Sequence, residues 1–285
     1  MISLLDGEVT GALRQWRSRN AMTTILGSAD LSKMAREVRE RAVFSARCTN
    51  ADFLQRLSEV VDELLSGKTN MASARWELMK SLKQLGYDPE VGFPDEMGEV
   101  PPAERGSLQD LSSERRLNLM LETNRRMAAG FGMMTGGNTP LALHHFPAWE
   151  LVRLYPRIIP RGSEESESPG WYERWAEAGA AVNFEGALDG PLMALKGSPI
   201  WQALGDGAGG HNDCLNNPYP PFAFNSGMGW KAVPRARAIQ EGLLHETSQV
   251  PRALGATLSP GRQEIVAVFD RLSPALRDVI RKALP

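Results

Sequence analysis

The chain has 285 residues, of which 42% are hydrophobic and 23% are charged, and it is long enough for about two domains of roughly 100–200 residues each. This composition favours a packed core and excludes a wholly disordered protein. The 32 basic and 34 acidic side chains give a formal charge of −2, which argues against a polybasic protein that coats DNA. Apolar runs are too short for a transmembrane helix and the first residues lack a signal-peptide pattern, so we expect no membrane partner. The two cysteines, Cys48 and Cys214, are far apart and predict no disulfide framework.

Hydrophobic side chains recur every three or four residues in the first third of the chain, as on one face of a helix. Ser28 or Asp30 can cap a first helix, and Asn50 can cap a second. Asn70 can cap a third helix, which Gly86 is suited to end. The side chains expected along the third helix's apolar stripe are Ala72, Trp76, Met79, Leu82 and Leu85. Three such helices can bury their apolar faces against one another as a small bundle.

Residues 88–110 interrupt this pattern with four prolines, three glycines and seven carboxylates against the single Arg105. Proline removes backbone donors and glycine loosens the backbone, so this segment is expected to be an acidic linker or an extended arm. An arm of this kind can span neighbouring subunits of an assembly, although a solvated linker is the simpler interpretation.

The middle of the chain mixes helices with short strands. A long helix is expected from about residue 111 to Gly130, ended by the glycines that follow. Strands are expected over residues 151–155 and 192–195, and a short helix after Pro169. Ser198 and Pro199 are suited to begin another helix, and residues 205–229 are expected to be irregular.

We therefore predict an α+β protein that is mostly helical, in four parts. These parts are an N-terminal helical domain (1–87), an acidic linker (88–110), a mixed domain with a few short strands (111–245) and a C-terminal pair of helices (246–285).

Candidate chemistry in the chain is sparse, and we assign no catalytic, cofactor-binding or metal-binding residue. The glycines at 205, 207 and 210 match a dinucleotide-binding pattern, but a helix is expected before them instead of the strand that such a site needs. A zinc site would need the His144-His145 pair to converge with His211 and Cys214. In an alternative enzyme hypothesis, Asp206, His211, Asp213 and Cys214 would surround a pocket.

Six arginines are weak candidates for contact with DNA or with an acidic partner, since guanidinium groups pair well with phosphate and carboxylate. They are Arg115, Arg116, Arg125, Arg126, Arg153 and Arg157. The alternative is that those of the long helix form a solvated helical face.

The most distinctive segment is rich in proline and aromatic residues, and its key members are Pro218, Tyr219, Pro220, Pro221, Phe222, Phe224 and Trp230. Prolines stiffen the backbone in an extended form, which lets the aromatic side chains pack inward at low entropic cost. The segment is either a pinned loop that closes its domain or a rigid docking surface for a partner.

Four stretches, taken in order, resemble the phage Mu-type head morphogenesis family, also called minor head proteins. The first is the helical run at 121–130 (LETNRRMAAG), and the second is the strand at 147–153 (PAWELVR). The third is the SPIW element at 198–201, and the fourth is the late segment at 220–230 (PPFAFNSGMGW). The arginine, serine and glutamate constellation of an ADP-ribosyltransferase-like site is missing, so no catalytic residue is carried over.

The resemblance implies a structural protein of a tailed phage or prophage-derived particle. It would lie in the virion head or neck near the portal, after assembly in the cytoplasm of the bacterial host, and would support head assembly and DNA packaging or ejection. The implied partners are the portal or the major capsid protein and packaged DNA, with several copies per particle and no cofactor. A head–tail connector or adaptor, and a phage-borne transferase-like enzyme, are the alternatives.

Overall fold

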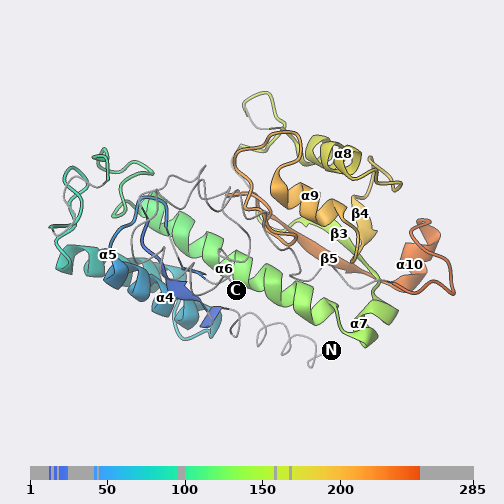
Figure 1. The fold of residues 1–285 in the computed structure, drawn as a ribbon, viewed down its shortest axis with the longest axis horizontal. Coiled ribbons are helices and arrows are strands. Elements are labelled where there is room, and N and C mark those ends of the chain that lie inside the picture. The colour runs from blue at the N-terminus through green and yellow to red at the C-terminus, as the bar shows by residue number, and fades with distance from the viewer. Residues whose placement is uncertain are drawn as a thin grey trace, which may run out of the picture. The chain divides into compact units, whose positions relative to one another are not determined.

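A computed structural model describes residues 45–94, 100–156, 159–166 and 169–250, together with residues 13, 16, 17, 19–24, 42 and 43 (Figure 1). The described residues fall into two compact units. We call those up to Ala128 the N-terminal unit and those from Ala129 onward the C-terminal unit. The division lies within helix α6 (Glu114–Gly137).

The N-terminal unit is built on α4 (Ala51–Leu65), α5 (Met71–Gln84) and the first part of α6, with a short parallel pair of strands, β1 (Asn20–Ala21) and β2 (Ala42–Val43). Asn50 and Asn70 cap α4 and α5 as expected, since their side chains accept hydrogen bonds from backbone amides of the first turn. Gly86 follows the end of α5 with φ +73°, the left-handed conformation that ends many helices. The helix expected after Asp30 lies mostly outside the described residues.

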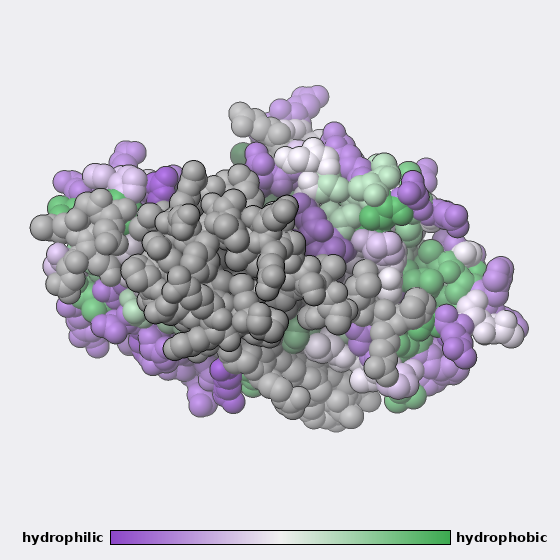
Figure 2. All heavy atoms as spheres, in the orientation of Figure 1, coloured by the Kyte–Doolittle hydropathy of each residue, from purple (hydrophilic) through white to green (hydrophobic). Residues whose placement is uncertain are grey.

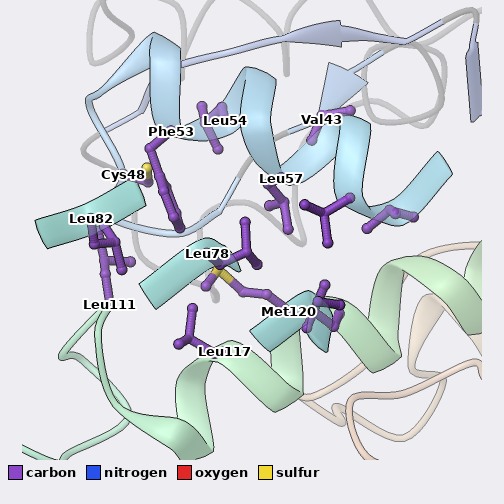
Figure 3. Close-up of a cluster of buried hydrophobic side chains, with 14 of the residues drawn as sticks. Val43, Cys48, Phe53, Leu54, Leu57, Leu78, Leu82, Leu111, Leu117 and Met120 are labelled. Atoms are coloured by element: carbon purple, nitrogen blue, oxygen red, sulfur yellow. The ribbon is translucent and has the colours of Figure 1, made fainter. Parts of the chain in front are cut away.

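Aliphatic side chains from all three helices form the core of this unit (Figure 3). Phe53, Leu54 and Leu57 of α4 are fully buried, as are Leu78 of α5 and Leu117 of α6. One detail of the prediction is wrong, because Trp76 and Met79 are 61% and 39% exposed. The buried stripe of α5 is instead Ala74, Leu78 and Leu82.

Part of the expected linker belongs to the N-terminal unit. Phe93 is 3% exposed, and its ring lies 6.5 Å from Phe53 and 5.1 Å from Tyr87. The Tyr87 hydroxyl accepts a hydrogen bond from the Leu111 amide at 3.0 Å. Asp110 is also buried and accepts hydrogen bonds from the Gly106 and Ser112 amides. Phe93 and Asp110 therefore anchor this segment to the N-terminal unit, while most of its other described residues are exposed, as in a solvated linker.

The C-terminal unit surrounds a small antiparallel sheet with short helices. Its elements after α6 are α7 (Pro140–His145), β3 (Ala148–Arg153), α8 (Trp171–Ala181), β4 (Met193–Leu195), α9 (Ile200–Asp206), β5 (Met228–Val233) and α10 (Arg235–Gln240). The sheet order is β4-β3-β5, and six residue pairs join β3 to β5. The strands at β3 and β4 and the helices at α8 and α9 were expected, whereas α7, β5 and α10 were not.

Gly130 does not end the long helix, because α6 continues to Gly137. A Cβ atom on Gly130 would overlap the backbone carbonyl oxygen of Pro220. The glycine is therefore needed for a close approach between α6 and the proline-rich segment, and the prediction mistook a packing requirement for a helix terminator.

The described residues confirm a mostly helical α+β protein. The helix pair predicted within 246–285 lies mainly beyond residue 250 and so outside the described residues. In the part of the chain that the structure describes, no helix is long and apolar enough to cross a membrane.

Candidate functional site

Five large rings meet in the core of the C-terminal unit, and we call this set the aromatic cluster. Its members are Trp149, Trp175, Trp201, Phe222 and Trp230. Trp149 of β3 and Trp230 of β5 stack with centroids 5.0 Å apart and an interplanar angle of 3°. Trp201 of α9 meets Trp175, Trp230 and Phe222 at 5.2, 5.3 and 6.1 Å. Contacts of this kind add to the apolar burial of each ring.

The proline-rich segment supplies one wall of this core. Its buried residues run from Asn217 to Ala223, with Tyr219 and Phe222 fully buried. The Tyr219 ring meets Phe131 of α6 at 5.7 Å. The expected inward packing of the aromatic rings is therefore found, and half-buried Phe224 and exposed Asn225 are left at the surface of the segment.

Most side chains named for a rigid docking surface are thus unavailable to a partner. Pro218, Tyr219, Pro220, Pro221, Phe222 and Trp230 are all buried. A docking role for this segment stays a prediction, restricted to the surface around Phe224 and Asn225.

Stretches far apart in the sequence converge at this cluster. Trp149 lies in 147–153, Trp201 in 198–201, and Phe222 and Trp230 in 220–230. The end of the run at 121–130 also reaches it, since Gly130 lies against the Pro220 carbonyl. Aromatic residues of three of the four stretches therefore meet in the core of the C-terminal unit, while most of the run at 121–130 belongs to the N-terminal unit.

Buried Lys196 lies beside the stacked pair of tryptophans. Its side-chain nitrogen is 4.1 Å from the centre of the Trp149 ring and donates to the Gly137 carbonyl at 3.1 Å. The ammonium group thus contacts an aromatic face and the carboxyl end of α6, and both of these stabilise a cation.

A second, polar cluster contains two buried arginines that share one carboxylate. Arg161 contacts Asp213 at 2.5 Å and Arg174 contacts it at 2.9 Å, and each arginine side chain is 3% exposed. Both guanidinium groups also lie near the Trp171 ring, with Cζ 5.9 and 5.4 Å from its centre. Arg161 additionally donates to the Phe224 carbonyl at 2.9 Å. The cluster therefore ties α8 to the loops around it.

Burial and charge act in opposite directions on Asp213. Burial disfavours the ionised carboxylate, but the hydrogen bond from Arg174 and the charges of Arg161 and Arg174 outweigh it and hold the pKa of Asp213 below its ordinary value. The pKa of neighbouring Cys214 is shifted in the opposite direction, because burial raises the pKa of its thiol to about 11. The thiol is therefore neutral at physiological pH, which makes it a poor nucleophile.

Two of the four residues of the enzyme hypothesis share a partner, because the Arg174 guanidinium contacts Asp213 at 2.9 Å and the Cys214 sulfur at 3.9 Å. The other two make contacts elsewhere. Exposed Asp206 pairs with Gln202 on its own helix. His211 contacts Glu177 of α8 at 2.5 Å, while Asp213 binds the two arginines and Cys214 is buried. A cavity of about 450 Å³ lies elsewhere, lined by Pro140, Leu143, His144, Arg235 and residues 246–250.

The side chains that a zinc site would need are not brought together either. The rings of His144 and His145 on α7 meet edge to face, with centres 4.9 Å apart and an interplanar angle of 81°. No group of three or more histidine, cysteine, aspartate or glutamate side chains among the described residues is arranged to hold a metal ion.

The six candidate arginines are not equivalent. Arg116 is buried and donates to the Ser45 hydroxyl and the Ala46 carbonyl at 2.7 and 2.8 Å, so it is a core residue and its assignment as a partner contact is wrong. Arg126 pairs with Glu122 at 2.5 Å, and Arg125 is half-buried. Exposed Arg115 and Arg153 remain accessible, and Arg157 lies outside the described residues.

Residue spacing in the sequence does not reveal the arginine pair or Lys196. A readable signal did exist for Arg174, which lies between Trp171 and Trp175 on the apolar face of its helix. An arginine on a buried helical face needs an acidic or aromatic partner. Arg161 and Lys196 carry no such local signal, because the groups that hold them come from distant segments.

Comparison with known proteins returns no family model, no curated protein and no solved structure that matches this chain.

Proposed function

We propose that this chain is a structural protein of a tailed phage or prophage-derived particle, a minor head protein located in the head or neck near the portal. In this role it supports head assembly and DNA packaging or ejection. Its partners are the portal or the major capsid protein, and exposed Arg115 and Arg153, together with Arg157, are candidates for contact with packaged DNA.

The observation that supports this proposal is the convergence of the family-like stretches. Trp149, Trp201, Phe222 and Trp230 belong to three of them and pack ring against ring. A shared domain core is where a family's most constrained large side chains are expected.

The internal pairing of polar groups is compatible with an architectural role. Asp213 neutralises part of the charge of two buried arginines, and Arg237 of α10 pairs with Glu150 of β3 at 2.8 Å. These contacts join loops and helices to the sheet, so they contribute to the shape of the unit. A head–tail connector would use the same properties and differs from the proposal in its position within the particle.

Mass spectrometry of purified proheads and mature particles tests the proposal. We expect the chain in both at a few copies per particle. Absence from both preparations, with the portal protein detected as an internal standard, would contradict the proposal. A ring of about twelve copies bound at the portal exit would favour the connector instead.

A further inference from the structure

The outward face of α5 carries apolar and basic side chains that no described residue covers. Trp76 is 61% exposed and Met79 is 39% exposed, and Lys80 and Lys83 are exposed beside them. Spacings of three and four residues place these four side chains on one side of the helix. We call this surface the α5 face.

The side chains of the α5 face take no part in the buried side of the helix or in its ion pairs with the described residues. The helix already has a complete buried side, and its half-buried Arg75 and Glu77 pair with Glu114 and Arg56. Lys80 and Lys83 have no ion pair with any described residue. An exposed tryptophan ring beside two lysines that no described carboxylate pairs with is chemically suited to contact an acidic partner.

The C-terminal unit carries a surface of opposite charge around α8. Tyr172 of α8 is 60% exposed and Leu188, in the segment that follows the helix, is 41% exposed. Glu173 of α8 and Glu185 and Asp189 of the following segment are also exposed. Figure 2 shows hydrophilic and hydrophobic residues together on the surface over α8. We call these five residues the α8 face.

The segment around α8 is acidic throughout. Glu164 and Glu165 are exposed in the loop that precedes the helix. The only basic residue in the sequence from 162 to 195 is Arg174, which is buried against Asp213. The segment therefore presents carboxylates to solvent with no exposed cation among them.

We infer that the α5 face of one copy of this chain binds the α8 face of a second copy. Each face includes an exposed aromatic ring and a second exposed hydrophobic side chain, and their charges are complementary. Because the two faces differ, the contact is head-to-tail, and repetition gives a ring if the rotation closes or a filament if it does not. The formal charge of only −2 leaves little overall repulsion between copies.

This inference adds a partner, a second copy of the chain, to the proposed function. Its test requires no virion, so a failure in solution leaves the particle experiment above unaffected.

Sedimentation velocity of the full-length chain over a wide concentration range tests the contact. We expect reversible self-association that weakens as salt concentration rises, since exposed charges are screened. Lys80→Glu combined with Lys83→Glu should raise the dissociation constant about tenfold, and Trp76→Ala should do so without any change of charge. Lys80→Glu alone is compared with Arg115→Glu, which reverses one charge at another exposed helical position of the same unit.

Reversing the charges on both faces of one chain gives the most direct test of the contact. Glu173→Lys combined with Asp189→Lys should weaken association, and the chain that carries both pairs of reversals should regain most of it. A chain that stays monomeric at every concentration would overturn the inference. So would equal effects of Lys80→Glu and Arg115→Glu, or a failure of the combined reversals to restore binding.

Discussion

In the N-terminal unit, Leu57, Leu78 and Leu117 meet across three helices whose apolar spacing is regular along the sequence. In the C-terminal unit, Trp149, Trp201 and Trp230 come from two strands and a short helix that are widely separated in the chain. The first core follows from local periodicity, because each helix presents its own stripe. The second depends on contacts between segments with no regular pattern, so a single altered ring or loop affects several elements at once.

The largest expected effects are losses of stability when one buried side chain of either core is truncated. Trp201→Ala should destabilise the C-terminal unit by about 4 kcal/mol, since it removes a fully buried ring that three other aromatic rings contact. Leu78→Ala should destabilise the N-terminal unit by about 3 kcal/mol. Hydrogen exchange followed by mass spectrometry reports each unit by its own peptides. Equal loss of protection in both units for either variant would contradict two separate cores.

The next effect tests the close approach at Gly130. Gly130→Ala places a methyl group against the Pro220 carbonyl and should cost about 3 kcal/mol despite alanine's better helix propensity. The control is Ala129→Gly at the neighbouring exposed position, which should cost about 1 kcal/mol. Thermal unfolding compares the two variants. A stabilising Gly130→Ala substitution would show that the helix does not approach the proline-rich segment.

The polar cluster should contribute less than the rings, because Asp213 is partly exposed. Asp213→Asn keeps the shape but leaves two buried guanidinium groups without a carboxylate, at a cost of about 2 kcal/mol at neutral pH. The pKa of Asp213 is lower in the folded protein than in the unfolded chain, where it is about 3.9. Its contribution to the free energy of unfolding is therefore fully present when the pH is above the unfolded pKa, and is lost as the pH falls through the folded pKa. The difference between wild type and variant should therefore shrink on acidification. A difference in unfolding free energy that stays constant from pH 7 to pH 2.5 would contradict this assignment.

The smallest effect concerns a helix cap in the N-terminal unit. Asn50→Ala removes the side-chain acceptor for the Phe53 amide and should cost about 1 kcal/mol, measured by urea denaturation. Asn50→Ser, which keeps an acceptor oxygen, is the matched control and should cost less. If both variants lose the same stability, the cap is not the source of the effect.

Local signals predicted the N-terminal unit well, because a cap and an apolar stripe act within one helix. Asn70 and Gly86 mark the ends of α5 correctly, whereas Trp76 was assigned to the buried stripe since its hydrophobicity outweighed its position on the helix. The C-terminal unit was predicted only in part. Gly130 appeared to be a helix terminator because the Pro220 carbonyl that requires it lies ninety residues away in the sequence.

The candidate site shows the same division between local and distant information. The proline-rich segment stood out by composition, but its burial depends on α6, α9 and β5, which local patterns do not reveal. Arg161 and Arg174 were missed because Asp213, the carboxylate that joins them, belongs to a distant loop. Burial of Arg116 likewise depends on acceptors at Ser45 and Ala46, far from α6 in the sequence.

A cryo-electron microscopy map of the purified particle, with the head and neck resolved, tests the central proposal most directly. We expect density next to the portal that accommodates the C-terminal unit, with the stacked Trp149 and Trp230 side chains at its centre. A complete map of head and neck in which every density is assigned to other proteins would contradict the proposal.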